Sequence, residues 1–290
     1  MEGTLSRLVD EAELDDFALG AAILGSGGGG NPYIGMLLAK QAIRAEGPVT
    51  LVDLGEVDDD ALVVPAAMMG APTILVEKLP SGDEIVHAFR TLEEYFGRPI
   101  SHAVPVEAGG VNSMIPFSVA ARAGIPLVDA DLMGRAFPEL QMCLPTLAGI
   151  SATPMTIADE KGNSVIINTN DNRWTERLAR SITIDMGCAS MITLYPMSGR
   201  QLKETAIPGT LSLGQELGSL VHSRRSQHRD PIEATRDRLG GVELFAGKLA
   251  DIERRTEGGF ARAEVFVEGD RKSTRLNSSH IQKSRMPSSA

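Results

Sequence analysis

Aromatic residues make up only 4% of this 290-residue chain, so small aliphatic side chains must build most of its core. Hydrophobic residues account for 42% and charged residues for 23%, a balance typical of a folded protein. No apolar run approaches the roughly 18–20 residues that a membrane-spanning helix needs. Residues 1–10 lack the basic segment and following apolar stretch of a signal peptide. These absences predict a soluble protein with no membrane partner.

Cysteine is also scarce, with only Cys143 and Cys188. Two cysteines imply no disulfide framework, and their small or apolar neighbours favour reduced thiols in a cytoplasmic protein. No histidine lies near Cys188 in the sequence, so we expect this thiol to pack rather than to act as a nucleophile.

Several catalytic signatures are missing. The chain contains no HxH, HExxH or CxxC pattern, which argues against a histidine-bound metal site. It has no Gly-x-Ser-x-Gly elbow and no Walker lysine, which argues against a serine hydrolase and a nucleotide-binding P-loop.

The net charge of −10 is unevenly spread. Residues 271–290 carry five of the 28 basic residues and no acid, which leaves 23 basic against 38 acidic residues, or −15, in the rest of the chain. Such an acidic body would repel a polyphosphate backbone, so we expect no nucleic-acid partner.

The basic stretch 271–290 has neither helical nor strand periodicity and is rich in Ser, Arg and Lys. It resembles a translated sequencing adaptor, and a natural basic tail is the alternative. We predict a disordered, non-native tail and a natural protein that continues beyond Asp270.

Helix-like and strand-like segments alternate before that tail, which predicts an α/β fold with a mostly parallel sheet and flanking helices. Asn31 and Pro32 predict the cap and first residue of a helix. The predicted helices span residues 10–24, 32–45, 82–96, 113–123, 174–184, 209–223 and 231–239, and the predicted strands span residues 49–52, 61–64, 73–76, 102–106, 126–128, 155–159, 164–168, 191–195, 242–252 and 261–267.

The pattern of predicted elements changes from about Thr153, where the alternation of helices and strands gives way to a hairpin with a turn at 160–163. We therefore predict an N-terminal α/β domain over residues 1–165. A smaller, β-rich and incomplete α+β domain is predicted over residues 166–270, ahead of the tail at 271–290.

The first candidate site is a glycine run, residues 25–30, that opens onto the helix at Pro32. Glycines free the backbone to take positive φ, and N–H groups at a helix start can bind an anion or a carbonyl oxygen. The run is either a flexible joint or a ligand loop that contains Gly27, Gly28, Gly29, Gly30 and Asn31.

The second candidate site follows the strand 102–106. Glu107 stands where a general base would be placed, because ligands bind beyond the carboxyl ends of strands in open α/β sheets. Asn112 and Ser113 follow and are predicted to cap the next helix. The structural alternative is that Glu107 only caps that helix.

The third candidate site lies at the end of the strand 126–128. Asp129 and Asp131 alternate, so they share one face if the strand continues, and Arg135 follows. The two acids would bind a metal, or one would take a raised pKa for acid chemistry. The alternative is an Asp–Arg ion pair that fastens the loop.

Together, the motifs GSGGGGNPYIG, EAGGVNS, VDADLMGRAFPELQM, TLYPMSGRQLK and LFAGKLADIERRTEGGF resemble the S-methyl thiohydantoin desulfurase family. The resemblance covers residues 5–270 and implies an α/β N-terminal part and a smaller β-rich C-terminal part. Cys188 departs from the family pattern, which has glycine there.

The resemblance implies hydrolysis of the C–S bond of an S-methylated thiohydantoin to a hydantoin and methanethiol. For this reaction we assign Glu107 or Asp129 as the base, and Asp131 as its acid partner or orienting group. Gly27, Gly28, Gly29, Gly30, Asn31, Asn112 and Ser113 would hold the heterocycle, and Arg135 a substrate carboxylate.

We expect no cofactor, and a divalent metal such as zinc, held by Asp129 and Asp131, is the alternative. The expected partner is a small heterocycle, and a homo-oligomer stays open. Two other functions stay open too: a hydrolase of hydantoin-like cyclic amides, and a non-catalytic subunit of a hydantoinase or oxoprolinase complex.

Overall fold

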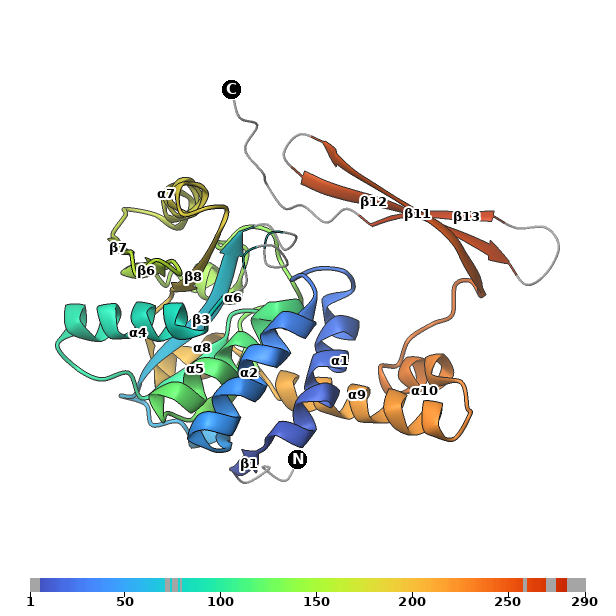
Figure 1. Ribbon diagram of the computed structural model, residues 1–290, viewed down its shortest axis with the longest axis horizontal. Coiled ribbons are helices and arrows are strands. Elements are labelled where there is room, and N and C mark those ends of the chain that lie inside the picture. The colour runs from blue at the N-terminus through green and yellow to red at the C-terminus, as the bar shows by residue number, and fades with distance from the viewer. Residues whose placement is uncertain are drawn as a thin grey trace. The chain divides into compact units, whose positions relative to one another are not determined.

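A computed structural model describes residues 6–70, 74, 78, 80–257, 260–269 and 275–280. The chain forms two compact units, which divide between Ser219 and Leu220 (Figure 1). Every residue considered below as a site lies in the first unit.

The first unit is built on one sheet with the strand order β1-β2-β5-β4-β3-β8-β6-β7. Its four central strands, β2, β5, β4 and β3, are parallel to one another. At one side β1 pairs antiparallel with β2, and at the other side β8, β6 and β7 each pair antiparallel with the strand before them in the sheet. Two short strands pair outside this path, β9 with β3 and β10 with β5. The strands are β1 (Arg7–Val9), β2 (Val49–Asp53), β3 (Leu62–Gly70), β4 (His102–Pro105), β5 (Leu127–Asp131), β6 (Met155–Ala158), β7 (Ser164–Ile167), β8 (Ala189–Thr193), β9 (Met197–Ser198) and β10 (Ile207–Pro208).

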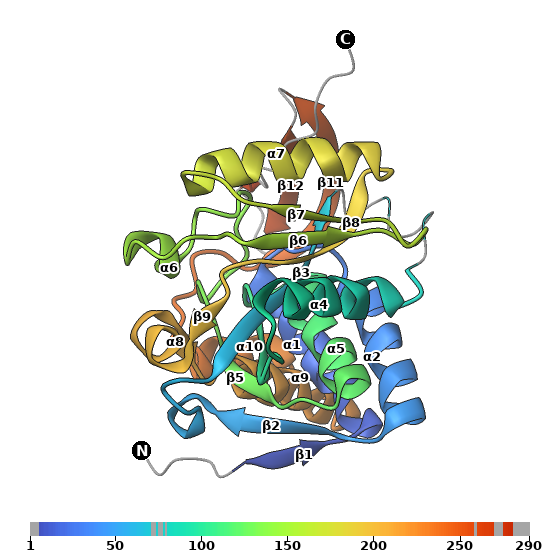
Figure 2. The ribbon, with the colours of Figure 1, turned by 90° about the vertical axis from the view of Figure 1, so that its left-hand side faces the viewer.

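Helices cover both faces of this sheet, as Figure 2 shows from the side. Alternate residues of β3 point to opposite faces: Val64 joins a core under α1, α2, α4 and α5, and Val63 joins a core under α7 and α8. The helices are α1 (Leu14–Gly25), α2 (Pro32–Glu46), α4 (Asp83–Phe96), α5 (Ile115–Ala123), α6 (Leu144–Leu147), α7 (Asn172–Asp185), α8 (Gly199–Thr205) and α9 (Thr210–Ser226), with 3-10 turns η1 (Glu11–Glu13), η2 (Leu54–Glu56) and η3 (Gly110–Ser113).

The second unit contains α10 (Pro231–Arg238) and an antiparallel sheet of β11 (Gly247–Glu257), β12 (Phe260–Gly269) and β13 (Arg275–His280). Strand β13 lies in the stretch predicted to be disordered, and six of its residues pair with β12. An open strand edge presents unpaired backbone groups that accept an extended segment of almost any composition. The prediction of disorder and of non-native origin otherwise falls on residues outside the described ones.

The predicted α/β class is confirmed: the fold has a parallel central sheet with flanking helices and a second part with a smaller sheet. The predicted N-cap is also confirmed, because Asn31 Oδ1 accepts a hydrogen bond from the Tyr33 N–H at 3.0 Å and Pro32 begins α2. The predicted hairpin forms as β6 and β7. The predicted strand 73–76 lies mostly outside the described residues.

The division predicted at residue 165 differs from the division between the compact units. Strands β6, β7 and β8 continue the first sheet, and β8 pairs directly with β3. The change in the pattern of predicted elements near Thr153 therefore marks the change from parallel to antiparallel pairing within one sheet.

Both cysteines are free. Cys188 has a φ of 66°, in the left-handed region that favours glycine, which explains why glycine would suit this position. Among the described residues, no helix is both long and apolar enough to cross a bilayer.

Close backbone packing between α1 and α9 yields a test. A Cβ on Gly20 would lie 1.7 Å from the Gly214 carbonyl oxygen, whereas the nearest atom to a Cβ on Gly214 would be Leu24 Cδ1, at an ordinary contact distance of 3.7 Å. Alanine favours a helix by about 1 kcal/mol over glycine, and overpacking costs about 1–3 kcal/mol. We expect Gly20→Ala to lower the free energy of unfolding by about 1–2 kcal/mol and Gly214→Ala to raise it or leave it unchanged in urea denaturation. Equal effects of the two substitutions would contradict this packing.

Candidate functional site

The candidate site lies at the carboxyl edge of the parallel strands. Strands β4 and β5 are neighbours and run in the same direction, so their carboxyl ends meet at one edge of the sheet. Glu107 follows the end of β4 by two residues, and Asp131 is the last residue of β5. The two carboxyl groups are thereby brought together.

Glu107 is buried, with 3% of its surface exposed, and both of its oxygens accept hydrogen bonds. Asn112 Nδ2 donates to Oε1 at 2.7 Å, and the Phe137 N–H donates to Oε2 at 2.8 Å. These donors come from two different loops, one after β4 and one after β5. Glu107 does not cap the following helix in this arrangement, so its side chain joins the two loops instead.

The pKa of Glu107 is raised to about 7, chiefly by burial and in smaller part by the nearby Asp131 carboxyl, while the bonds from Asn112 and Phe137 act against the rise. At neutral pH, therefore, the protonated and ionised forms of Glu107 are both populated. A group in this state can serve as a general acid or a general base.

Asp131 is fully buried, and its Oδ2 accepts hydrogen bonds from the N–H groups of Met133 at 2.9 Å and Gly134 at 2.7 Å. Burial raises the pKa of Asp131, and these N–H groups oppose the rise. The Thr210 hydroxyl also acts to lower the pKa. Within the described part of the chain, however, neither Asp131 Oδ1 nor Thr210 Oγ1 has a hydrogen bond of normal geometry. The site thus holds a buried acceptor and a buried hydroxyl that can bind a further group.

The glycine run packs its backbone against the loop that carries Glu107. The Val111 N–H donates to the Gly29 carbonyl at 2.8 Å, and a Cβ on Gly29 would lie 2.6 Å from the Gly109 carbonyl oxygen. A Cβ on Gly110 would come within 2.1 Å of Gly29. Only glycine permits this approach, so the run is neither a free joint nor an unobstructed ligand loop along its whole length. Gly27, with a φ of 89° and open space around its Cβ position, is the part that faces no neighbour.

Asn112 and Ser113 act within the protein. Asn112 Oδ1 accepts a hydrogen bond from the Met68 N–H at 2.8 Å while its Nδ2 holds Glu107, so the side chain connects β3 with the carboxylate. Ser113 Oγ accepts from the Gly109 N–H at 2.7 Å and does not cap α5. The predicted cap is therefore wrong, because both side chains turn back toward the loop before the helix.

The carboxyl group of Asp129 forms its hydrogen bonds with the start of α9. Its Oδ1 accepts from the N–H groups of Leu211 at 2.9 Å and Ser212 at 3.1 Å, and Ser212 Oγ donates to Oδ2. Asp129 is thus the N-terminal cap of α9, a role for which the sequence holds no local signal. Arg135 is exposed, in a segment that is irregular rather than helical.

Several partners of the carboxyl groups were missed at the sequence level, including the N–H groups of Met133, Gly134 and Phe137 and the hydroxyl of Thr210. Phe137 contributes only its N–H, which no side-chain pattern reveals, and Thr210 comes from a segment far from β5 in the sequence. The position of Phe137 within the VDADLMGRAFPELQM motif was the one available signal.

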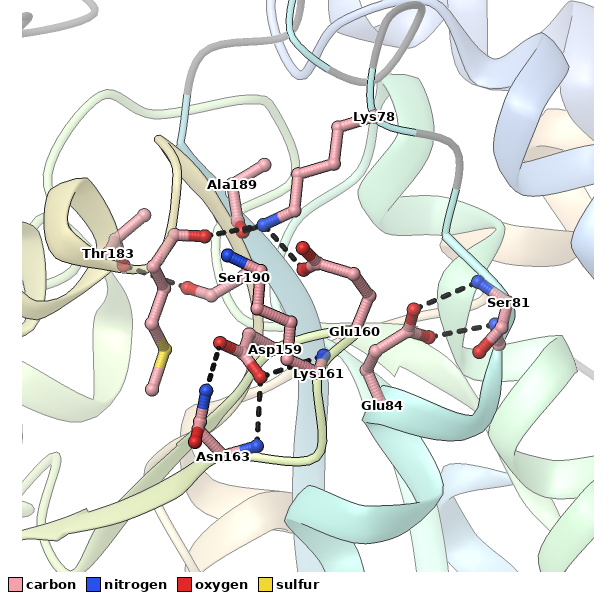
Figure 3. A network of polar contacts seen from close by, with 12 residues as sticks. Lys78, Ser81, Glu84, Asp159, Glu160, Lys161, Asn163, Thr183, Ala189 and Ser190 are labelled. Carbon is pink, nitrogen blue, oxygen red and sulfur yellow. Dashed lines mark hydrogen bonds and ion pairs between the residues drawn. The ribbon is translucent and has the colours of Figure 1, made fainter.

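A hollow open to solvent lies elsewhere on the first unit, and its polar groups already have partners (Figure 3). Lys78 Nζ forms an ion pair with Glu160 Oε2 at 2.6 Å and donates to the Ala189 carbonyl at 2.9 Å. Glu84 accepts from the N–H groups of Ser81 and Gly82. The hollow is lined by Met68, Lys78, Pro80, Glu84, Ala158, Asp159, Glu160, Ala189, Ser190 and Met191, none of which belongs to the carboxyl pair. We therefore base the site on the geometry of Glu107 and Asp131.

In the described segments, no group of three or more His, Cys, Asp and Glu side chains is arranged to hold a metal ion. Asp129 and Asp131 are held by different sets of N–H donors.

The fold and the site define a class of protein: an α/β protein with a buried pair of carboxyl groups at the strand ends. The chain belongs to the S-Me-THD-like family. The model "S-Me-THD-like, N-terminal domain" matches residues 12–169, and "S-Me-THD-like, C-terminal domain" matches residues 170–283. The predicted family is confirmed.

One solved structure, an X-ray crystal structure of a protein from Chromobacterium violaceum, is 26% identical with a TM-score of 0.75. The match covers 93% of this chain and 74% of that chain. No curated protein matches.

The raised pKa of Glu107 predicts how stability depends on pH. The folded protein keeps the proton on Glu107 up to about pH 7, whereas the unfolded chain loses it near 4.5, so this group weakens the fold as pH rises between these values. The difference amounts to about 3 kcal/mol at pH 8. We expect Glu107→Gln, which cannot ionise, to gain stability relative to the parent protein from pH 5 to pH 8 in urea denaturation. A constant difference across that range would show that the pKa of Glu107 is not raised.

The cap on α9 predicts a different effect for Asp129. Removing a capping side chain costs about 0.5–2 kcal/mol, so Asp129→Ala should lower the free energy of unfolding by that amount. The loss should be matched by Ser212→Ala only in part, because the backbone N–H bonds remain. Wild-type stability of Asp129→Ala would contradict the capping role.

Proposed function

We propose that the protein is a desulfurase of the hydrolase type, which cleaves the C–S bond of an S-methylated thiohydantoin-like heterocycle to give a hydantoin and methanethiol. The observation that carries the proposal is the buried pair of Glu107 and Asp131, which stands at adjacent strand ends with raised pKa values. Membership in the S-Me-THD-like family supports the choice of substrate.

The reaction needs one base and one acid, and a pair of carboxyl groups that shares one proton supplies both. Two neighbouring buried carboxyl groups disfavour double ionisation, and the Asp131 carboxyl adds to the rise in the pKa of Glu107. In the proposed reaction the ionised form of Glu107 is the base, and Asp131, whose pKa burial also raises, is the acid. The Asp131 Oδ1 atom, which lacks a partner of normal geometry among the described residues, is the acid atom.

The steps balance with water as the only co-reactant. Glu107 takes a proton from water while the water oxygen attacks C2 of the ring, which lies between the two nitrogens. The electron pair of the C=N bond moves to the ring nitrogen. The tetrahedral intermediate then expels the methylthio group, which takes the proton of Asp131 and leaves as methanethiol. The remaining water proton passes from oxygen to the Asp131 carboxylate as the carbonyl forms. Glu107 gives its proton to the ring nitrogen, so that a hydantoin results and both carboxyl groups return to their starting states.

Other residues would orient the ring. The Thr210 hydroxyl, buried next to Asp131, can donate to the negative charge that develops on a ring nitrogen. The N–H groups of the Gly27–Asn31 loop and the exposed guanidinium of Arg135 are proposed to hold the outer end of the substrate. Asn112 and Ser113 act indirectly, since their polar atoms are engaged with Glu107, Met68 and Gly109.

Access to the buried pair requires movement of a surrounding loop. Gly27 in the glycine run has a positive φ and no described neighbour within 4 Å of its Cβ position, so packing does not hold this part of the run in place. We propose that it moves when the heterocycle enters. The protein is proposed to act in the cytoplasm without a cofactor.

Methanethiol release by the purified protein tests this function. We expect Glu107→Gln and Asp131→Asn each to lower kcat by about a hundred-fold or more, since a positioned general acid or base contributes about 10²–10⁴-fold. Asp129→Asn is the matched control, with the same chemical change on the same strand, and should keep most of the activity.

Four results would contradict the proposal. Near-normal rates in Glu107→Gln and Asp131→Asn would remove the carboxyl pair from the reaction. Ring opening of a hydantoin without methanethiol would favour a cyclic amidase, and binding of the heterocycle without any turnover would favour a non-catalytic subunit. Loss of activity on chelation, restored by zinc, would show a metal-dependent reaction.

A further inference from the structure

The loop between β5 and α6 supplies N–H groups to both carboxyl groups, and helix α7 holds that loop. Three polar residues of α7, Asn172, Glu176 and Arg180, are spaced by four and lie on one helical face. We name them the α7 stripe. We propose that the α7 stripe positions Glu107 and Asp131 for the proposed reaction, on which this inference rests, by fixing the backbone of the loop that binds them.

Glu176 is the centre of the stripe. It is buried, with 5% of its surface exposed, and its Oε2 accepts a hydrogen bond from the Leu140 N–H at 3.0 Å. Arg180 holds the other oxygen, with Nη2 at 2.6 Å from Oε1, and also donates to the Pro138 carbonyl at 3.4 Å. The carboxylate is therefore paired and fixed in direction, and a charged acceptor makes a stronger bond to N–H than a neutral one.

Asn172 holds α6 and the segment that follows it, directly after the loop. Its Nδ2 donates to Thr146 Oγ1 and to the Ile150 carbonyl, both at 3.0 Å, and its Oδ1 accepts from the Ala152 N–H at 2.7 Å. Tyr195, at the end of β8, adds a fixed point from the interior, because its hydroxyl donates to the Leu140 carbonyl at 3.0 Å. Both backbone polar groups of Leu140 are thus bound by side chains from distant parts of the sequence.

The position of Leu140 connects the stripe with the carboxyl pair. The Phe137 N–H, which binds Glu107, lies three residues before Leu140, and the Met133 and Gly134 N–H groups, which bind Asp131, lie just upstream. The segment between them is irregular, so nothing periodic holds it in place. In a loop without regular structure, the positions of the N–H groups depend on the hydrogen bonds that hold its backbone, here those to Leu140.

The stripe also explains what the second matched region contributes. The loop lies within the N-terminal family model, which ends at residue 169, and the stripe lies within the C-terminal model, which begins at residue 170. The stripe is how a helix from the second region acts on carboxyl groups of the first.

The test compares Glu176→Ala with Thr175→Ala in the full-length protein. Thr175 is buried in the same turn, and its hydroxyl bonds to Asp171 and Thr169 rather than to the loop, so its loss weakens α7 without touching Leu140. Two readouts do not depend on activity: the pH titration of Glu107 by carboxyl carbon NMR, assigned with Glu107→Gln, and hydrogen exchange of the Phe137 amide.

In Glu176→Ala we expect faster exchange at Phe137 and an upward shift of the pKa of Glu107, because the Phe137 bond that opposes the rise is loosened. Thr175→Ala should leave both unchanged. If methanethiol is released, kcat should fall by about ten- to a hundred-fold with little change in KM. Glu176→Gln, which keeps an acceptor for Leu140 but loses the ion pair, should lie between the parent and Glu176→Ala.

The inference is overturned if Glu176→Ala and Thr175→Ala behave alike in the titration of Glu107 and in exchange at Phe137. These readouts decide the role of the stripe even if the parent protein releases no methanethiol, so failure of the proposed reaction and failure of the stripe are separable.

Discussion

The carboxyl group of Glu107 is buried where three loops meet, and each loop makes a specific contact there. The loop after β4 carries Glu107 and binds it through Asn112, the loop after β5 binds it through the Phe137 N–H, and the glycine run packs on the first of these. Burial without these donors would cost the carboxyl group several kcal/mol. The glycines, the strand ends and the site are thus parts of one arrangement.

The same constraint gives the glycine-rich sequence a structural reason. Gly25, Gly29, Gly109 and Gly110 face one another, and a Cβ on Gly109 would lie 2.5 Å from Gly25 Cα. Side chains there would separate the loops and expose Glu107 to water, which would lower its pKa toward the ordinary value. Backbone packing and the tuning of the carboxyl group are therefore coupled, and the glycines affect chemistry without contacting a substrate.

Much of the fold and part of the site could be predicted from sequence. Parallel strands followed by acidic residues place Glu107 and Asp131 at one edge, because the carboxyl ends of such strands meet there. The cap at Asn31 and the hairpin at 160–163 are local patterns, and both form. What local patterns cannot show is pairing at a distance. The bond from Asp129 to α9 spans about 82 positions, and the bond from Glu176 to Leu140 spans 36. For the same reason, the pairing of β8 with β3, which extends the first sheet beyond residue 165, left no periodic signal.

The central claim is that Glu107, buried beside Asp131, carries a proton in part of the molecules near neutral pH. Infrared difference spectroscopy at pH 7 tests it directly, since a protonated carboxyl group has a C=O stretch that a carboxylate lacks. The account predicts a buried carboxylic acid band that is altered or lost in Glu107→Gln and in Asp131→Asn but kept in Asp129→Asn. Absence of such a band in the parent protein, or one unchanged by both substitutions, would contradict the account.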